Sequence, residues 1–348
     1  MSRNLRVAII GAGPAGFYAA EGLIKNLENV SVDIIEALPT PYGLVRYGIA
    51  PDHQKIKSVS RLYERTAADP RVNLLANVNF GTDINLAEIN KHYDAVVFTT
   101  GASSDRSLGI KGEDLAGSIS ATNFVAWYNG LPAYKDFISS LDAKAVAVIG
   151  VGNVAVDVVR ILAKSVDELA TTDIADHSLE VLKESQVKDI YMIGRRGPAQ
   201  AKYTTKELRE LGELVNADIF VDKEDLVLDE ESQKVAENDR AISKQLTELA
   251  NYAQRKPEGK ARRVHIKFLA SPTEIKGESK VEAIVLEKNR LEPTPSGYIN
   301  AVGTGQFETL PVDMVLRSVG YRGVKLPDIS FDEKRGIIPN ADGRVLTE

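Results

Sequence analysis

Two stretches of the chain share one hydrophobic pattern, a short apolar run that ends at closely spaced glycines. The first reads VAIIGAGPAG over residues 7–16, and the second reads VAVIGVGNVA over residues 146–155. Uninterrupted apolar runs of this length are typical of parallel strands buried on both faces, and the glycines then allow a tight turn into a helix. We therefore predict a strand, a turn and a helix at each place.

The remaining apolar runs predict an α/β fold. Further buried strands are expected over residues 30–36, 93–101, 189–193, 264–268 and 313–321, with shorter strands over residues 72–75 and 78–80. We predict two Rossmann-like dinucleotide-binding domains. Residues 1–102 form the first domain, residues 103–320 form a second domain inserted into it, and residues 321–348 return to the first.

Polar and amphipathic segments lie between these runs. Residues 55–68 carry apolar side chains at helical spacing and are expected to form one helix. Residues 165–188 read as an insertion of two polar helices, and the charged residues 224–240 as a solvated loop or helix.

The glycines of the two turns indicate what the domains bind. A backbone without Cβ atoms can approach a pyrophosphate closely, and the positive N-terminal end of the following helix stabilises its charge. One such turn is weak evidence. Two turns, each in its own strand-helix-strand unit, predict two dinucleotides held face to face, as in a flavoenzyme that a nicotinamide reduces.

Composition narrows the class of protein. The chain has 348 residues, of which 43% are hydrophobic and 26% charged, and this is typical of a soluble globular protein. No apolar run approaches the roughly 20 residues that span a bilayer. The net charge of -6 argues against general nucleic-acid binding. Because no apolar leader precedes the first strand, we expect a cytoplasmic location.

The chain contains no cysteine. Flavoenzymes that reduce disulfides use a pair of cysteines, and iron-sulfur clusters are normally held by thiolates. Both are therefore excluded within this chain. If it handles electrons, they must leave the flavin directly for an external acceptor, and no metal site is expected.

In each strand-helix-strand unit, the residues after the second strand indicate which ribose is bound, and they differ in charge between the two units. Glu36 ends the strand over residues 30–36, about 20 residues after Gly16, where a carboxylate accepts hydrogen bonds from a ribose diol. After the strand over residues 189–193 come Arg195 and Arg196, which suit a ribose 2′-phosphate and predict NADP(H) rather than NAD(H). The alternatives are a solvated acid at a strand end and an exposed arginine pair on a loop.

Seven motifs, in order along the chain, make it resemble the adrenodoxin reductase family of NADPH:ferredoxin reductases. They are GAGPAGFY at 11–18, YGLVRYGIAPDH at 42–53, WYNGLP at 127–132, GNVAVDV at 152–158, GRRGP at 194–198, TKELRE at 205–210 and GIIPN at 336–340. The resemblance implies that electrons pass from NADPH through FAD to a ferredoxin-type iron-sulfur protein.

The resemblance also implies roles for individual residues. FAD is expected at Gly11, Gly13, Ala15, Gly16, Glu36, Leu44 and Phe80, the last through its backbone. NADP is expected at Gly150, Val151, Gly152, Asn153, Val154, Arg195 and Arg196, with Glu207 near the nicotinamide end.

The family places His53 and Asp157 as a pair close to the flavin. A histidine that titrates near neutral pH beside a carboxylate suits a proton route. Alternatively, His53 fixes the turn at Pro51, and Asp157 is an acid favoured by the dipole of its helix.

The resemblance further implies an acidic protein partner. Arg209 and Lys244 are candidates for a basic docking face, with Lys206, Arg262 and Arg263 as additions. The alternative is a set of scattered solvated charges.

The sequence ends at Glu348, before a family segment that closes over FAD. We therefore expect that the 348-residue chain binds NADP(H) but retains FAD weakly. Two alternatives remain at this point. One is an NADPH-oxidising subunit resembling the glutamate synthase small chain, whose signature cysteines are missing here, and the other is a non-catalytic NADP-binding protein.

Overall fold

The computed structural model describes residues 3–295 and 297–346. The ends of the predicted domains, residues 1–2 and 347–348, lie outside the described residues. The chain forms two compact units, one made of the residues up to 104 and from 321 onward, and the other of residues 105–320. We call them the first and the second unit. Parallel sheets flanked by helices confirm the predicted α/β fold.

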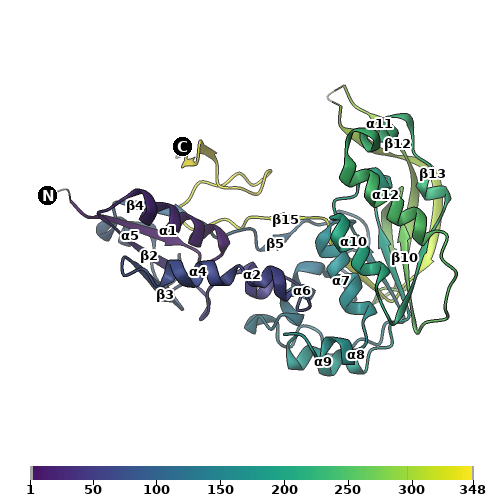
Figure 1. The fold of residues 1–348 in the computed structure, drawn as a ribbon, viewed down its shortest axis with the longest axis horizontal. Helices are drawn as coiled ribbons and strands as arrows, with labels where there is room; N and C mark the ends of the chain where they lie inside the picture. Colours follow the sequence, from purple (N-terminus) through teal and green to yellow (C-terminus); the bar gives the residue numbers. More distant parts are fainter. Residues whose placement is uncertain (1–2, 296, 347–348) are drawn as a thin grey trace. The chain divides into compact units, whose positions relative to one another are not determined.

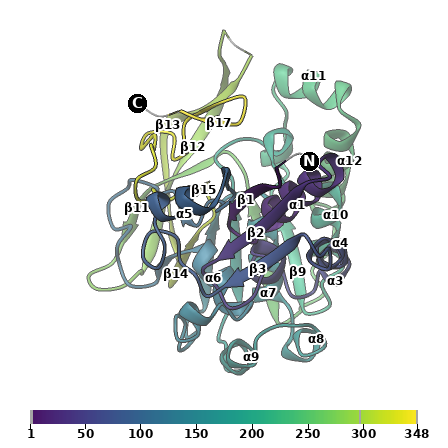
Figure 2. The same ribbon diagram turned by 90° about the vertical axis from the view of Figure 1, so that its left-hand side faces the viewer.

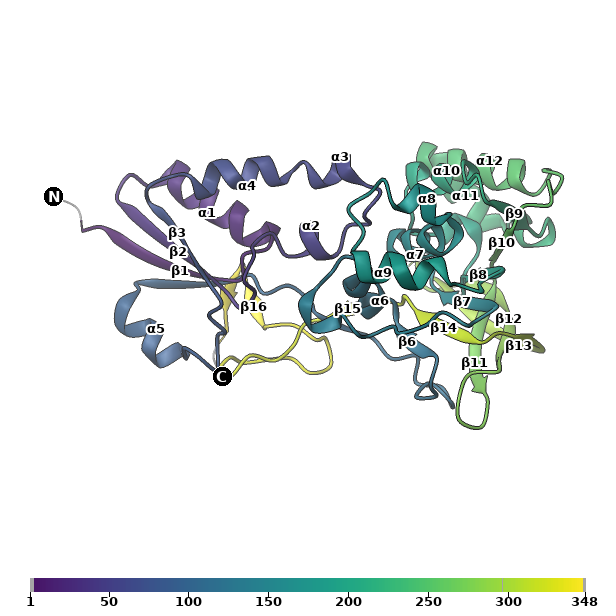
Figure 3. The ribbon, with the colours of Figure 1, turned by 90° about the horizontal axis from the view of Figure 1, so that it is seen from below.

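The first unit is built on a four-stranded parallel sheet of order β3-β2-β1-β4. Figure 2 shows β1, β2 and β3 side by side. In Figure 3 the helices α1 and α4 lie over one face of this sheet and α5 lies under the other. The bounds are β1 (Leu5–Ile10), α1 (Pro14–Asn26), β2 (Val30–Glu36), α4 (Ser60–Ala67), β3 (Val72–Ala76), α5 (Leu86–His92) and β4 (Ala95–Phe98).

Alternate residues of β1 enter two different cores. Val7 and Ile9 pack with Phe17 of α1 on one face, whereas Ala8 and Ile10 pack with Ile89 of α5 on the other. Burial on both faces explains why the strand is apolar throughout rather than alternating with polar residues. The same burial fixes the place at which the first glycine turn leaves the sheet.

Two local predictions for the first unit are wrong. Residues 55–68 form two helices, α3 (Gln54–Lys57) and α4, because the Ser58 hydroxyl donates to the Lys55 carbonyl (2.7 Å) where the helix would continue. Residues 78–80 form no strand. The Asn79 amide donates to Asp83 Oδ2 (2.8 Å), which closes this segment into a turn.

The second unit is built on a six-stranded parallel sheet of order β6-β14-β7-β8-β10-β9. The strands are β6 (Ser118–Ser120), β7 (Ala145–Ile149), β8 (Asp189–Ile193), β9 (Ala217–Val221), β10 (Arg262–Lys267) and β14 (Met314–Arg317). The helices are α6 (Ala121–Tyr128), α7 (Asn153–Ala163), α8 (Val166–Leu169), α9 (Asp176–Lys183), α10 (Thr205–Gly212), α11 (Glu230–Asn238) and α12 (Arg240–Tyr252).

An antiparallel sheet that the sequence analysis did not predict completes the second unit. It consists of β11 (Ala270–Lys276), β12 (Ala283–Pro293) and β13 (Ile299–Pro311), of which the long β12–β13 hairpin is labelled in Figure 1. Ile284 and Leu286 of β12 pack with Ala147 and Ile149 of β7. The sheet therefore covers one face of the parallel sheet and supports the ends of its central strands.

Short elements complete the fold. They are α2 (Leu44–Tyr47), β5 (Ser104–Asp105), η1 (Pro132–Tyr134), η2 (Pro198–Gln200), η3 (Glu224–Leu226), β15 (Tyr321–Arg322), β16 (Asn340–Ala341) and β17 (Arg344–Val345). Among the helices of the described residues, none has both the length and the apolar character needed to cross a bilayer.

Candidate functional site

The first glycine turn connects β1 to α1 in a conformation that only glycine adopts without strain at Gly11. Its φ is +108°, and a Cβ there would lie 2.7 Å from the Thr99 carbonyl oxygen. A Cβ at Gly16 would lie 2.2 Å from the Gly11 carbonyl oxygen. Thr99, which the sequence analysis missed, donates its hydroxyl to that same carbonyl (2.9 Å). The turn is therefore packed tightly on its inner side.

The outer side of the first turn is open. A Cβ at Gly13 would meet nothing within 4 Å, and no side chain caps the N-terminus of α1 in the described part of the chain. Ala15, one residue further into the helix than Pro14, is exposed. Uncapped amides at the start of a 13-residue helix suit a pyrophosphate. The residues at this turn therefore fit the ADP half of a dinucleotide.

Glu36 is fixed against the first turn. One carboxylate oxygen accepts the amide of Ala12 (2.8 Å), and the other accepts the amide of Leu38 (3.0 Å). Each carboxylate oxygen can accept a further hydrogen bond, and ribose hydroxyls are donors of the right kind. The geometry thus suits a ribose diol.

Leu44 and Phe80 differ in what they can offer a ligand. The Tyr42 amide donates to the Ala12 carbonyl (2.7 Å), which brings the start of α2 to the first turn, and Leu44 follows there with 56% of its surface exposed. Phe80 is buried, with its ring 5.6 Å from that of Phe98. Phe80 can therefore face a ligand with its backbone and not with its ring.

His53 lies in the first unit at the N-terminus of α3, and its side chain is buried. Its amide donates to the Ala50 carbonyl (3.0 Å), and its own carbonyl accepts the amide of Ile56 (3.0 Å). Its backbone therefore closes the turn that contains Pro51. Asp157, the predicted partner of His53, belongs to the second unit, and we describe it there.

The second glycine turn connects β7 to α7. Gly150 has φ +137°, and a Cβ there would lie 2.2 Å from the Ser318 carbonyl oxygen. The outer side is again open, because the nearest atom to a Cβ at Gly152 is 4.0 Å away. Val154, in the first turn of α7, is half-buried. This turn also has room for a pyrophosphate.

Two hydrogen bonds tie the second turn to the start of α10. The Val151 carbonyl accepts the amide of Lys202 (2.8 Å), and the Asn153 side chain accepts the amide of Thr204 (2.8 Å). Thr204 is the N-cap of α10, and its hydroxyl accepts the amide of Glu207 (3.3 Å). The position of Glu207 is therefore linked to the second turn.

A buried ion-pair cluster joins α7 to α10. The Arg160 guanidinium lies 2.7 Å from Asp157, 3.4 Å from Glu207 and 3.3 Å from Glu210, and its side chain is 1% exposed. One guanidinium facing three carboxylates compensates part of their charge and fixes their positions. The structure thus brings Asp157 and Glu207 together through Arg160, which the sequence analysis missed because an arginine within a helix gave no separate signal.

Arg195 and Arg196 lie on a loop of residues 194–197, which we call the arginine loop. Arg195 is exposed and Arg196 is half-buried. The arginine loop is held through its backbone, because the Asn289 side chain donates to the Arg195 carbonyl (2.7 Å) and the Leu269 amide donates to the Arg196 carbonyl (3.1 Å). Within residues 3–295 and 297–346, neither guanidinium has a carboxylate partner. Both remain available to an anion.

The position that Glu36 occupies after β2 in the first unit corresponds to a glycine after β8 in the second unit. Ile35 of β2 accepts the amide of Gly11 (2.8 Å), and Ile193 of β8 accepts that of Gly150 (2.8 Å). Glu36 follows the first isoleucine and Gly194 follows the second. A Cβ at Gly194 would lie 2.9 Å from Val151 Cγ1, so that a side chain there would require Val151 to move. The second turn therefore has no carboxylate at the position that corresponds to Glu36.

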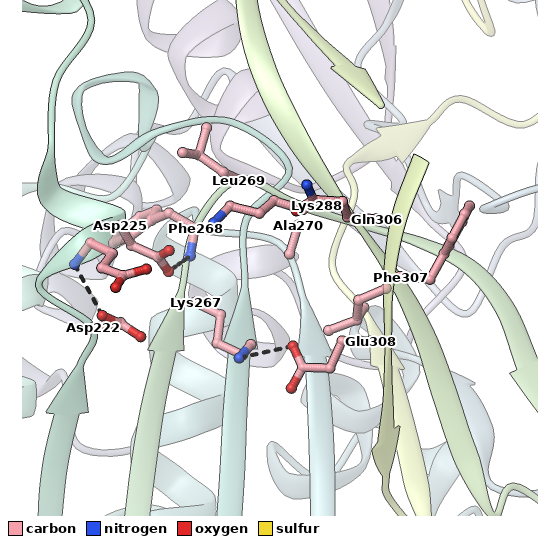
Figure 4. Close-up of a pocket in the computed structure, with 12 residues that line it drawn as sticks. Asp222, Asp225, Lys267, Phe268, Leu269, Ala270, Lys288, Gln306, Phe307 and Glu308 are labelled. Carbon is pink, nitrogen blue, oxygen red and sulfur yellow. Dashed lines mark hydrogen bonds and ion pairs between the residues drawn. The ribbon is translucent and has the colours of Figure 1, made fainter. Parts of the chain in front are cut away.

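A pocket of about 270 Å³ lies beyond the arginine loop, at the ends of β9 and β10 (Figure 4). Lys267 pairs with Glu308 across it (3.2 Å), and Asp222 and Asp225 line another side. Burial raises the pKa of Asp225, whose carboxylate accepts the Phe268 amide (2.9 Å). Carboxylates around the lysine disfavour a phosphate in this pocket.

Comparison with known proteins shows the family. Residues 5–193 match the family described as pyridine nucleotide-disulphide oxidoreductase. NADPH-ferredoxin reductase FprA of Mycobacterium tuberculosis is 46% identical over 350 residues, which are 99% of this chain and 76% of that protein. The mitochondrial NADPH:adrenodoxin oxidoreductase of Arabidopsis thaliana is 43% identical, over 99% of this chain and 74% of that protein.

A solved structure agrees with these sequence matches. Mycobacterium tuberculosis FprA in complex with NADPH superposes with a TM-score of 0.94 at 46% identity, over 99% of this chain and 76% of that one. The chain thus spans about three quarters of the length of these relatives. The 348 residues contain no cysteine. The chain belongs to the adrenodoxin reductase family of FAD-dependent NADPH:ferredoxin reductases.

Proposed function

We propose that this chain binds FAD at the first glycine turn and NADPH at the second, and passes electrons from NADPH through FAD to a ferredoxin-type iron-sulfur protein. The observation that carries the assignment is the difference between the turns. Glu36 in the first unit and Gly194 in the second occupy corresponding positions, each directly after the isoleucine that accepts the amide of the first glycine, and the two arginines follow directly after Gly194. A carboxylate suits the ribose diol of FAD, and guanidinium groups suit the 2′-phosphate of NADPH.

The proposed FAD residues surround the first turn. The first turn holds the pyrophosphate, Glu36 holds the ribose, Leu44 offers an exposed apolar side chain and Phe80 offers its backbone. These residues are Gly11, Gly13, Ala15, Gly16, Glu36, Leu44 and Phe80.

The proposed NADPH residues lie in the second unit, around the second turn and the arginine loop. The turn binds the pyrophosphate through its open outer side, and the arginines bind the 2′-phosphate. Glu207 is assigned to the nicotinamide end, where its carboxylate is held by Arg160. The remaining residues are Gly150, Val151, Gly152, Asn153, Val154, Arg195 and Arg196.

FAD supplies a group that accepts a hydride as two electrons and gives them up singly. The protein must then exchange protons with solvent, and we assign this task to His53 and Asp157. An imidazole can accept and donate a proton, and Asp157 is kept in place by Arg160 (2.7 Å). Because the chain has no cysteine, electrons leave for a separate protein and not for an internal disulfide.

We propose that the acidic partner docks on α10 and α12, through Arg209 and Lys244. Arg209 pairs with Glu248 (2.7 Å), with more than half of its side chain exposed, and Lys244 is exposed. The additional candidates also have partners within the chain: Lys206 pairs with Glu210, Arg263 with Asp189, and Arg262 with the carbonyl oxygens of Leu162 and Lys164.

We also propose a cytoplasmic location, supported by the composition of an ordinary soluble protein. Relatives include mitochondrial enzymes of Arabidopsis thaliana and Homo sapiens, so the compartment needs its own test. Fractionation of the source cells, followed by detection of the chain with an antibody, provides it. Recovery from an organelle or a membrane fraction contradicts the proposal.

Stoichiometric electron transfer tests the proposed function. The purified chain is supplied with FAD, limiting NADPH and an excess of oxidised ferredoxin without oxygen. A hydride carries two electrons, so two ferredoxins are expected to be reduced for each NADPH oxidised. Binding of NADPH without reduction of ferredoxin or of any artificial acceptor would instead indicate a non-catalytic NADP-binding protein.

A further inference from the structure

The β12–β13 hairpin holds the arginine loop through the side chain of Asn289. This side chain is 4% exposed, and its amide nitrogen lies 2.7 Å from the Arg195 carbonyl oxygen and 2.8 Å from the Ser271 hydroxyl oxygen. The pairing of β12 with β13 shifts register between Glu287 and Asn289. The extra residues of this irregularity lie on β13, and the Asn289 amide on β12 is directed into the protein at the arginine loop.

The same hairpin holds the guanidinium of Arg196 through Tyr298. The guanidinium carbon lies 5.2 Å from the centre of the Tyr298 ring, within the range of a cation–π contact. The Tyr298 backbone is itself fixed, because its amide donates to the Thr294 hydroxyl (3.1 Å) and its carbonyl accepts the Thr294 amide (2.7 Å). A half-exposed ring at 48% is thus held in one place over the arginine.

Stacking and phosphate binding use different parts of a guanidinium. The ring contacts the face of the planar group, whereas the N–H donors that bind a phosphate lie along its edge. A stacked Arg196 therefore keeps its donors available while losing part of its rotational freedom. Holding a long side chain in its binding conformation before the ligand arrives reduces the entropy lost on binding.

We propose that Asn289 and Tyr298 are positioning residues for the 2′-phosphate of NADPH. Asn289 fixes the backbone of Arg195, and Tyr298 fixes the guanidinium of Arg196. This inference rests on the proposed function of the arginine loop. It assigns part of the preference for NADPH over NADH to a hairpin that contributes no charge to the phosphate.

The test for Tyr298 uses two probes that differ by one phosphate. Binding of 2′,5′-ADP and of 5′-ADP to the full chain is measured by calorimetry for the unmodified protein and for Tyr298→Ala, Tyr298→Phe and Phe307→Ala. Tyr298→Ala is expected to weaken the binding of 2′,5′-ADP about two- to fivefold and to leave the binding of 5′-ADP unchanged. Tyr298→Phe keeps an aromatic face and is expected to restore binding. Phe307→Ala removes an exposed ring from β13, the strand that follows Tyr298, and is expected to have no effect.

Asn289 is tested with Asn289→Asp, a substitution of nearly equal shape. A carboxylate cannot donate to the Arg195 carbonyl, and it places a negative charge beside the arginine loop. We expect binding of 2′,5′-ADP to fall about tenfold or more, with a much smaller change for 5′-ADP. Thermal unfolding checks that each variant is folded. If Asn289→Asp does not fold, the Tyr298 series and the following cycle still decide the proposal.

A double-mutant cycle separates this inference from the proposed function. If Tyr298 acts through Arg196, then Tyr298→Ala has no further effect in a chain that already carries Arg196→Ala. An equal loss for both probes, or a full effect of Tyr298→Ala without Arg196, overturns the inference. If Arg195→Ala with Arg196→Ala does not weaken 2′,5′-ADP selectively, the arginine loop is not the phosphate site and the proposed function itself fails.

Discussion

The two glycine turns share a backbone and differ in the residue that follows the neighbouring strand. In both, the first glycine has a positive φ and donates its amide to an isoleucine of the next strand. Glu36 then follows in the first unit, where its carboxylate accepts the amide of Ala12. Gly194 follows in the second, where a Cβ would lie 2.9 Å from Val151 Cγ1. We propose that each turn binds a pyrophosphate and that the position after the isoleucine decides which ribose is accepted.

Glu36 and the arginine loop also differ in the residues that hold them in place. Glu36 is held by the amides of Ala12 and Leu38, so its position in the first unit depends on local contacts. The arginine loop is held instead by Leu269 and by Asn289 of β12, which is almost a hundred residues away in the chain. The conformation of the arginine loop thus depends on residues that are distant from it in the chain.

Removing the arginines is expected to have the largest effect. Arg195→Ala together with Arg196→Ala deletes charge-assisted hydrogen bonds of about 1.5–3 kcal/mol each, so NADPH should bind about 100-fold more weakly or worse, with NADH nearly unaffected. Dissociation constants for both nucleotides provide the measurement. Arg290→Ala, which removes an exposed arginine from β12, is the control. Equal losses for NADPH and NADH would show that the arginines do not read the 2′-phosphate.

The next effect is expected from alanine at the first glycine of each turn. Gly11→Ala and Gly150→Ala each introduce a Cβ against a backbone carbonyl at a positive φ, which costs about 2–3 kcal/mol. We expect Gly11→Ala to weaken FAD and Gly150→Ala to weaken NADPH, each by roughly 100-fold. Gly22→Ala is the control, because a Cβ at this helical position meets nothing within 4 Å. Weaker binding of NADPH by the Gly11→Ala variant would contradict the assignment of NADPH to the second turn.

A smaller effect is expected from Glu36→Gln. The amide side chain keeps one acceptor oxygen, but it loses the charge and cannot accept from both Ala12 and Leu38. We expect FAD to bind about tenfold more weakly, which is on the order of 1.4 kcal/mol, with NADPH binding unchanged. Fluorescence of released FAD measures the change. Unaltered FAD affinity would remove Glu36 from the site.

The smallest effect concerns the protein partner. Lys244→Glu reverses one exposed charge on α12 and is expected to slow ferredoxin reduction a few-fold at low salt, while ferricyanide reduction stays constant. Stopped-flow kinetics at several salt concentrations provide the measurement. Lys280→Glu reverses an exposed charge between β11 and β12 and serves as the control. The same slowing in both variants would argue against a docking face at Lys244.

The confirmed predictions from the sequence rest on strong local patterns. The α/β fold, the family and the cofactors FAD and NADP follow from apolar strands, glycine spacing and motifs, and the structure and the relatives agree. The site residues remain predictions. Residues 55–68 were predicted as one helix because helical spacing continues across Ser58, whereas the Ser58 hydroxyl ends the first helix there.

The β11–β13 sheet was missed although its sequence carries a signal. Residues 284–286 are Ile, Val and Leu, and residues 294–297 are Thr, Pro, Ser and Gly, which are typical of a strand and a hairpin turn. No sequence pattern predicts that the Asn289 side chain donates to the Arg195 carbonyl, because that contact joins residues 94 positions apart. Arg160 was missed for the same reason, since its partner Glu207 lies on another helix.

An anaerobic titration of the chain supplied with FAD, followed by visible absorbance, tests the central claim most directly. The claim is that one chain holds FAD at the first turn and accepts NADPH in preference to NADH at the second. We expect NADPH to bleach the flavin at concentrations at which NADH does not, and Gly150→Ala to keep the flavin without being bleached at those concentrations. Equal bleaching by NADPH and NADH, or normal bleaching of Gly150→Ala by NADPH, would contradict it.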